Sequence, residues 1–484
     1  MSNERLNRHQ RQIIKRIIIR GKLILDTPTC LGSGDAEGPT DLMLMRDSIS
    51  SHVLLTGTSI AGALRNYLHE YENGYGENEE SNSLSTYLFG ARREDDDGDQ
   101  SSLIIHDSIS SKVPKVELRD GVQINSVTGV AKDKAKYDLE LLAEGTEFPL
   151  AFELIVEKDK HKDENRLLSA LTIALEGLEN SQIRIGMKKR RGFGRCYVSQ
   201  WQVWQFNLEE SQDRIAWLLF DRECTSNLQT GKISDILKPS KKCPDKRQRF
   251  TMKATFKLVG SLLIRSSQFS NEAAPDVVHL KSSRNGKEEN ILSGTSLAGV
   301  LRHRAEKIVN TLGNNQKIIN DVFGMVEKDN KDAKSSRLLV EESVIKNVNE
   351  LVQNRIAIDR FTGGAFYGAL FDEQPIFGKE ETCVTLKLEL RQPKDCEIGL
   401  LLLLLKDLWT SDLPVGSESS IGRGRLAGIK AEMSLKNSGK DQKTWTISQN
   451  GERLKISNAK KLESFVYRFV KEVQEGFNQV KSKK

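Results

Sequence analysis

The chain has 484 residues, of which 37% are hydrophobic and 29% are charged, and its formal net charge is +6. This length predicts two or three domains, and the apolar content is sufficient for ordinary cores. The basic excess is mild, so it favours a nucleic-acid partner only where Lys and Arg cluster along the chain.

Short-range sequence patterns argue against a protein stabilised by a structural metal ion, a secreted protein and a membrane-spanning protein. The six cysteines form no C-x-x-C pair, so neither a structural zinc site nor a disulfide framework is expected, and only Cys224 and Cys243 leave metal binding open. The polar N-terminus lacks the apolar segment of a signal peptide. The longest apolar run, Ile398–Leu405, is too short to span a bilayer and predicts a buried helix or strand. We therefore expect a cytoplasmic protein without membrane contact.

Hydrophobic periodicity and breaker residues predict the elements of the first half. In chain order they are a strand at 13–25, a loop at 28–41, a short strand at 42–45, a helix from 57 to about 70, a hairpin at 123–142, a strand at 148–157, a helix at 165–178 and a Gly-rich loop at 183–195 followed by a strand. The acidic segment 94–99 is predicted to be a solvated loop.

A nine-residue segment occurs twice. Gly57–Arg65 recurs as Gly294–Arg302, an offset of 294 − 57 = 237, with seven identical positions. Four further landmarks recur in the same order, at offsets of 234 or 230, and the last of them matches Gly192–Arg195 with Gly422–Arg425. Such a series predicts a tandem duplication.

The duplication predicts a first domain at 1–224, a linker at 225–246, and a second domain at 247–484 that ends in a basic helix and tail. The order of elements in each half is that of an α+β unit. It is compatible with a ferredoxin-like (RRM-like) βαββαβ fold that carries an inserted β-hairpin.

The repeated segment has the composition of a loop that enters a helix. Thr58 or Ser59 is expected to cap the helix N-terminus, and Gly62 and Gly299 are expected to let the helix pack closely on a sheet. A helix N-terminus made of small residues also suits a bound phosphate.

Basic residues gather around the late glycines of both halves. Lys188–Arg191 and Arg195 surround two glycines in the first half, and Arg423 and Arg425 alternate with glycines in the second. Backbone N–H groups of a Gly-rich turn can approach a phosphate, while Lys and Arg supply charge and donors. We expect a polyanion to bind at these loops, with a merely solvated basic turn as the alternative.

The G-T-S-x-x-G-x-L-R helix, the I-D-R-F-T-G hairpin at 358–363 and the late Gly-Arg loop resemble the RAMP superfamily. The resemblance is closest to the backbone subunits of type III CRISPR effector complexes, with two such subunits fused as in a type III-D arrangement. It covers most of the chain, once in each half. It implies a subunit for antiviral defence that lines up along a guide RNA (crRNA), with other effector subunits on both sides.

The resemblance also implies RNA contacts. The repeated helix and the late Gly-rich loop would hold the guide RNA backbone, and the hairpin would act as a thumb that wedges between bases of the guide–target duplex. The matching RNA-binding positions are Thr58, Ser59, Arg65, Lys189, Arg191, Arg195, Ser296, Arg302, Arg360, Arg423 and Arg425. The thumb positions are Asn125, Thr128, Gly129, Asp359, Thr362 and Gly363. Because Asn125-Ser126 replaces Asp359-Arg360, we expect the first thumb to hold RNA less tightly.

A nuclease aspartate is implied in the loop after the first strand. Asp41 matches it in the first half and Asp276 in the second (276 − 41 = 235), with Asp35 and Asp26 as fallbacks. The implied reaction is attack of the target RNA's own 2′-OH on the adjacent phosphodiester, which leaves a cyclic phosphate. Each carboxylate would accept a proton or help to hold a divalent metal ion, with Mg²⁺ expected.

Two alternatives remain open. In the first, the chain is a non-catalytic crRNA-binding scaffold and other subunits cut the target. In the second, it is a crRNA-processing ribonuclease that uses an early histidine, for which His9 and His52 are available. Target specificity would come from base pairing with the guide.

Overall fold

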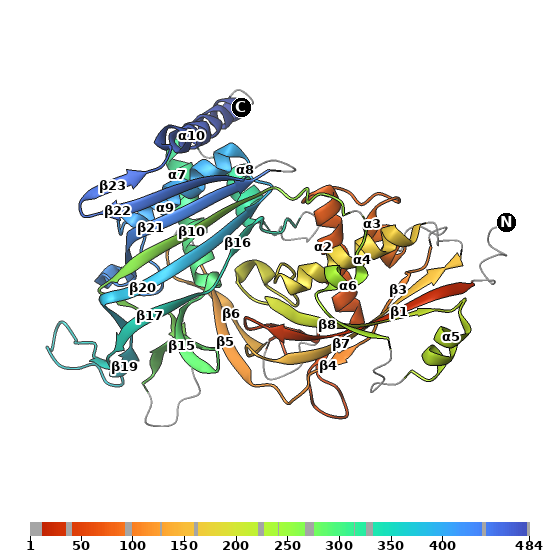
Figure 1. Ribbon diagram of the computed structural model, residues 1–484. Coiled ribbons are helices and arrows are strands. Elements are labelled where there is room, and N and C mark those ends of the chain that lie inside the picture. The colour runs from red at the N-terminus through yellow and green to blue at the C-terminus, as the bar shows by residue number, and fades with distance from the viewer. Residues whose placement is uncertain are drawn as a thin grey trace.

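The computed structural model describes residues 12–34, 41–91, 99–125, 128–158, 163–220, 227–240, 242–266, 275–313, 315–325, 333–437 and 442–481. The chain forms two halves side by side, each with a sheet and its own helices (Figure 1). Predictions that fall on His9, Asp35, Cys224 and most of the acidic segment 94–99 lie outside the described residues.

The first half is built on β1 (Ile13–Leu25), which alternates buried and less buried residues along its length. The strand pairs antiparallel with β7 (Glu147–Glu157) on one side and with β8 (Cys196–Asn207) on the other. Two shorter strands complete the sheet, in the order β3-β7-β1-β8-β9, where β3 is Leu103–Ile105 and β9 is Leu228–Gly231. Helix α2 (Gly57–Asn73) joins β1 to β3, and α4 (Glu164–Glu179) joins β7 to β8. This is the strand order of a ferredoxin-like fold.

The second half repeats this arrangement. Its ferredoxin-like strands lie in the order β16-β20-β10-β21. The elements are β10 (Arg249–Val259), α7 (Gly294–Leu312), β16 (Leu338–Val340), β20 (Ile376–Arg391), α9 (Asp395–Trp409) and β21 (Arg425–Lys436). Three elements then extend it, namely β22 (Lys443–Asn450), β23 (Arg453–Ile456) and the C-terminal helix α10 (Ala459–Lys481). The predicted α+β duplication is therefore confirmed.

The remaining elements are connections and insertions. In the first half they are β2 (Leu54–Leu55), α3 (Leu84–Phe89), β4 (Ser108–Ile109), β5 (Val116–Ile124), β6 (Ala131–Leu142), η3 (Lys189–Arg191), α5 (Ser211–Leu218) and α6 (Ile233–Leu237). In the second half they are β11 (Ser261–Leu262), β12 (Arg265–Ser266), β13 (Val277–His279), β14 (Lys281–Arg284), β15 (Lys287–Leu292), α8 (Gln316–Phe323), β17 (Ser343–Glu350), β18 (Gln353–Arg355), β19 (Phe371–Gln374) and η4 (Ser419–Ile421).

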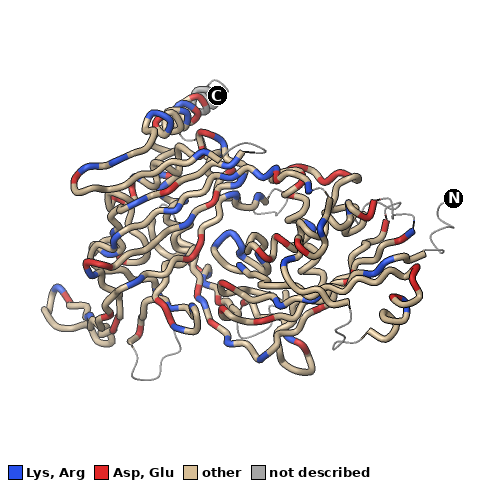
Figure 2. Tube along the Cα trace, in the orientation of Figure 1, with Lys and Arg blue, Asp and Glu red and all other residues tan. Residues whose placement is uncertain are grey.

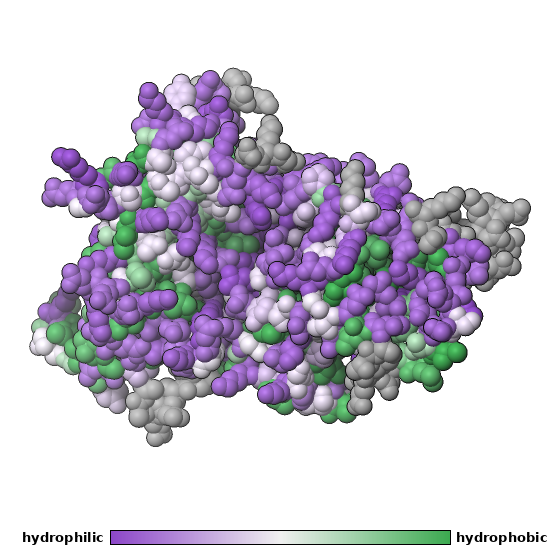
Figure 3. Space-filling model, in the orientation of Figure 1, coloured by the Kyte–Doolittle hydropathy of each residue, from purple (hydrophilic) through white to green (hydrophobic). Residues whose placement is uncertain are grey.

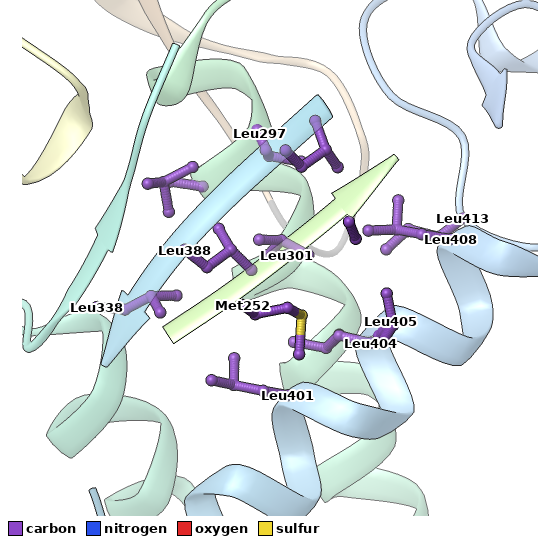
Figure 4. Packing of buried hydrophobic residues seen from close by; sticks show 14 of the residues in the cluster. Met252, Leu297, Leu301, Leu338, Leu388, Leu401, Leu404, Leu405, Leu408 and Leu413 are labelled. Carbon is purple, nitrogen blue, oxygen red and sulfur yellow. The ribbon is translucent and has the colours of Figure 1, made fainter. Parts of the chain in front are cut away.

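The apolar run Ile398–Leu405 lies inside α9, as a buried helix. Leu401, Leu404 and Leu405 point toward Met252 of β10, with leucines of α7 beyond (Figure 4). Helix α10 covers the other side of α9, where a side chain on Gly399 would clash with the Phe465 carbonyl. The run is apolar because both faces of α9 are covered by protein. In the described part of the chain, no helix combines the length and apolar character that a membrane crossing requires.

The predicted linker 225–246 contains regular structure. Strand β9 pairs with β8, and α6 follows it, so residues 228–237 extend the first half. The crossing to β10 is held by Arg247, whose guanidinium is buried over the Tyr67 ring and donates to Asp245 and to Gln182 (2.8 Å each). The boundaries at 224 and 247 stay predictions.

The starts of α2 and α7 differ from the expected caps. The side chains that accept from the helix N-terminus are Thr56 and Ser293, one residue before each glycine, rather than Thr58 or Ser59. The close-packed glycines are also one turn earlier than expected, because a side chain on Gly57 would lie 2.6 Å from the Ile105 carbonyl. Gly62 and Gly299 have no heavy atom near their open side, so their predicted role in close packing is wrong.

Candidate functional site

The two candidate nuclease aspartates occupy equivalent places. Asp41 Oδ2 accepts a hydrogen bond from the Asp138 backbone N–H (2.8 Å), and Asp276 Oδ2 accepts one from the Asp372 backbone N–H (3.0 Å). The next residues, Leu42 and Val277, make equivalent parallel bridges to the hairpin strands. Each aspartate therefore lies exposed at the base of an inserted hairpin.

The backbone N–H that each candidate accepts belongs to a second aspartate, Asp138 or Asp372. Asp138 and Asp372 are related by the hairpin offset (372 − 138 = 234). One oxygen of each, Oδ1, is buried without a hydrogen-bond partner in the described structure. The sequence analysis missed this pair, although an aspartate repeated at the hairpin offset was a visible signal.

The Mg²⁺ expectation stays a prediction. Each site brings two aspartates together, and among the described residues there is no group of three or more His, Cys, Asp or Glu side chains that could hold a metal ion. Water and RNA phosphate oxygens would have to complete the coordination shell. The fallback Asp26 forms an ion pair with Arg195, which occupies its carboxylate.

The surroundings of the two carboxylate pairs differ. In the first half, Lys136 Nζ lies 3.7 Å from Asp138 Oδ1 and 3.9 Å from Asp120 Oδ2. The equivalent positions in the second half, at the offset of 234, are Leu370 and Asn354. A cation therefore borders only the first of the two candidate sites at this position.

The two hairpin tips share one hydrogen-bond pattern. The Asn125 N–H donates to the Val130 carbonyl (2.9 Å), and the Asp359 N–H donates to the Gly364 carbonyl (2.8 Å). Both Asn125 and Asp359 also accept with Oδ1 from a threonine N–H three residues on (3.3 and 3.4 Å). Asn125 thus shares these two contacts with Asp359, which also accepts from the Phe361 N–H (2.7 Å). The second tip carries the exposed side chain of Arg360.

The predicted RNA contacts on α2 and α7 divide into exposed hydroxyls and paired arginines. Thr58 and Ser59 are exposed, and Ser296 is half-buried. Arg65 pairs with Glu79 (3.1 Å), and Arg302 pairs with Glu306 (3.0 Å) and donates to the Gly324 carbonyl (3.0 Å). The hydroxyls of Thr58 and Ser59 lie at the surface, whereas both arginines already form ion pairs within their own half.

The late Gly-rich loops have the same backbone conformation, but their side chains differ in charge. Lys188 and Glu418 both have left-handed φ (50° and 61°), and a side chain on Gly194 or Gly424 would clash with an equivalent carbonyl. The first loop then carries Lys189, Arg190 and Arg191, where the second carries Ser419, Ser420 and Ile421. Figure 2 shows the basic run of the first loop between the two halves.

The cations of the first loop are poorly compensated. Partial desolvation lowers the pKa of Lys189, although the residue is exposed at the surface, and burial lowers the pKa of Arg191. Burial together with nearby Arg391 lowers the pKa of Arg190 to about 10. Nη1 of Arg191 is buried and lacks a hydrogen-bond partner among the described residues. A charged donor in this state is stabilised by an anion, so a phosphate suits the loop.

The three remaining loop arginines have different surroundings. Arg195 pairs with Asp26 and with Glu341 of the second half (3.3 Å). Arg423 is only 3% exposed and pairs with Glu373 and Glu418. Arg425 is exposed and donates to the Ser411 carbonyl (3.1 Å). We expect Arg423 to stabilise its loop, and Arg425 to be the second-loop arginine that can reach a phosphate.

Of the two histidines named for a processing ribonuclease, His52 lies within the described residues. Nδ1 of His52 lies 2.7 Å from the Ser110 carbonyl, which occupies that ring nitrogen. This contact leaves the Nε2 nitrogen for other partners, and the processing alternative stays a hypothesis.

Comparisons with known proteins agree with this geometry. The sequence model of the RAMP superfamily matches residues 22–197 and again residues 255–427, once in each half. These two regions cover more than half of the chain, and each contains one Asp loop, one hairpin and one Gly-rich loop. No curated protein matches the chain at a significant level.

Proposed function

The chain belongs to the RAMP superfamily, with two RAMP regions in one polypeptide, and on this premise we propose that it is a backbone subunit of a type III CRISPR effector complex that binds crRNA and cuts target RNA. Membership by itself indicates a CRISPR-associated RNA-binding subunit. Cleavage at up to two places, one in each half, is the finer part of the proposal.

The repeated aspartate contact carries this proposal. The same N–H to carboxylate hydrogen bond occurs at the base of both hairpins, although the surrounding sequences differ. The bond uses one carboxylate oxygen and leaves the other side of Asp41 and Asp276 at the surface, where a strand of RNA could pass.

The chemistry needs a base at this place. The 2′ oxygen of the target attacks the adjacent phosphorus, its proton passes to the carboxylate of Asp41 or Asp276, and the P–O5′ bond breaks. The products are a 2′,3′-cyclic phosphate and a 5′-hydroxyl, the leaving oxygen taking a proton from water. A divalent ion held by Asp41 with Asp138, or by Asp276 with Asp372, would neutralise charge on the phosphate.

A cleavage assay on the assembled complex tests the proposal. Wild type, Asp41→Ala, Asp276→Ala and the double variant are compared on a matched target RNA, with and without Mg²⁺. Each single variant is expected to lose one distinct cut while target binding is retained. An unchanged set of cuts in the double variant would show that the aspartates are not the nuclease.

That second outcome corresponds to a scaffold function. In a scaffold, guide binding would survive in the double variant and cutting would belong to another subunit. Precursor crRNA cut in the presence of a chelator would instead identify a processing enzyme.

A further inference from the structure

The junction between the two halves serves as a template for a second junction. In the first hairpin, Glu117 of β5 accepts from Ser282 Oγ (2.9 Å) and from the Ser283 N–H (2.9 Å) of the β14–β15 hairpin. Beside it, Arg119 donates to Glu342 (3.2 Å) with its side chain only 5% exposed. The second half is thus seated on the outer strand of the first hairpin (Figure 1), and its elements β16 and α7 contact η3.

The second half carries the equivalent surface, and no other domain of the described structure covers it. Strand pairing fixes the equivalence, because Arg119 pairs with Leu139 as Gln353 pairs with Glu373, both at the offset of 234. Glu117 and Leu118 therefore correspond to Leu351 and Val352. This hairpin, marked by β19, lies on the side of the second half that faces away from the first (Figure 1).

The chemistry of this surface has changed from ionic to apolar. Leu351 is 55% exposed and Val352 is 46% exposed, and Ile421, at the position of Arg191, is 54% exposed. Figure 3 shows hydrophobic residues gathered at this edge of the molecule. Glu117 and Arg191, the counterparts of Leu351 and Ile421, lie against the second half, whereas Leu118, the counterpart of Val352, is itself 39% exposed. Exposed apolar residues at positions that a neighbouring domain covers in the first half, as at Leu351 and Ile421, indicate a docking surface.

A second copy of this chain fits the surface poorly. The hairpin that would dock corresponds to Arg46–Val53, because the bridge Arg46↔Val53 matches Lys281↔Asn290. In this register, Asp47 and Ser48 of the second copy would take the places that Ser282 and Ser283 occupy at the internal junction. The Asp47 carboxylate would then lie against the apolar Leu351 of the first copy. Glu342 would be replaced by Asp107 opposite the uncharged Gln353, so the buried ion pair would not form.

We infer that the outer strand of the second hairpin binds a RAMP-type domain of a different chain, one that presents apolar residues on its docking hairpin. This inference rests on the proposed function, because it takes the neighbour to be another backbone subunit. The ionic internal junction and the apolar external one then place this chain in a fixed order within the complex, since each surface accepts a different partner.

The test is native mass spectrometry of the complex assembled from this chain, its co-encoded effector subunits and crRNA. Leu351→Asp/Ile421→Asp is compared with Ile215→Asp/Leu218→Asp, which changes two exposed apolar residues on α5. The docking variant is expected to reduce occupancy of one neighbouring subunit at least tenfold, while the control and wild type retain it. Circular dichroism of the purified variants identifies any loss of fold.

Two results would overturn the inference: full subunit occupancy with the docking variant, or head-to-tail oligomers formed by the purified wild-type chain alone. Guide RNA occupancy is read from the same spectra. A wild-type complex that contains no guide RNA would contradict the proposed function. The number of neighbouring subunits bound to the docking variant tests the docking surface separately.

Discussion

The two Gly-rich loops have the same backbone conformation, but the side chains buried beneath them are apolar in the first half and charged in the second. In the first, Phe193 is buried with Cys30, Leu139 and Leu141 in a small apolar cluster. In the second, the position of Phe193 is taken by Arg423, and that of Leu139 by Glu373, and these two form a buried ion pair. The same buried position can thus hold an aromatic ring or a guanidinium that is paired with a carboxylate. A basic residue in a Gly-rich motif therefore does not by itself indicate a phosphate contact.

The exposed side chains of the loops differ in the same way. The first loop gathers poorly compensated cations at the junction of the halves, and the second presents Ser419, Ser420 and Ile421. The two halves keep the same loop backbone while the side chains differ, and we propose that the first loop binds RNA and the second faces a protein neighbour. The predictions below test this divergence, each with a matched change in the other half.

The largest effect is expected at the ionic junction. Arg119→Met removes the cation between Glu117 and Glu342, which are both largely buried. Because the carboxylates lose a partner, the free energy of unfolding should fall by about 4 kcal/mol. Urea unfolding followed by tryptophan fluorescence measures it.

The matched change is Gln353→Met, at the equivalent position of the second half. It removes one hydrogen bond, to Arg423 (2.7 Å), and should cost about 1 kcal/mol. Equal losses in the two variants would show that the junction does not depend on its ion pairs.

The second effect is a dependence on pH that only the second half should show. Burial lowers the pKa of His279 to about 4, and its ring nitrogens contact the Ile264 N–H (3.2 Å) and the Ile291 carbonyl (3.1 Å). Between pH 6.5 and 4 the unfolded chain binds a proton that the folded chain does not, so stability present above pH 6.5 is lost as the pH falls. The loss should reach about 3 kcal/mol.

The equivalent residue in the first half is the buried Leu44 (279 − 44 = 235). His279→Leu copies it, and should be less stable at pH 7 because two backbone groups lose a partner. Its stability should nevertheless change less between pH 7 and pH 4.5 than that of wild type, in urea titrations at each pH. An unchanged slope would rule out His279 as the titrating group.

The third effect is on guide RNA affinity. Lys189→Ala and Arg191→Ala should each weaken crRNA binding about tenfold and reduce the salt dependence by about one counterion. Ser419→Ala and Ile421→Ala are the matched changes, and should leave affinity within about twofold. Filter binding at several salt concentrations distinguishes the loops. Similar losses in both pairs would contradict the assignment of RNA binding to the first loop.

The smallest effect is on metal dependence. Lys136 places a positive charge beside the first carboxylate pair, where the second half has Leu370. A cation stabilises the charge that develops on the phosphate, so chelation of Mg²⁺ should slow the cut that depends on Asp276 about tenfold more than the cut that depends on Asp41. Cleavage rates with and without EDTA measure the ratio.

Exchanging the two residues sharpens this test. Lys136→Leu should make the first cut as sensitive to EDTA as the second, and Leu370→Lys should make the second cut less sensitive. If neither exchange alters the ratio, Lys136 takes no part in catalysis.

Much of the fold followed from the chain alone. Seven identities in nine residues between Gly57–Arg65 and Gly294–Arg302, with further landmarks in register, are enough to establish a duplication, because the same spacing places the same helix and loop in each half. The pairing of Asp41 with Asp276 was also readable, since both precede a short apolar strand. These features depend on local order, which a sequence states directly.

Other features depend on tertiary contacts between segments that are far apart in the sequence. The cap at Thr56 and the close approach at Gly57 depend on where β3 ends, and the burial of Arg423 depends on Glu373, fifty residues away. Asp138 became part of the candidate site because its backbone N–H meets a loop ninety-seven residues earlier. Sequence determined the repeat, the elements and the candidate residues. Tertiary structure decided which charges are paired and which surfaces stay open, because burial and electrostatic compensation are set by neighbours in space rather than in the chain.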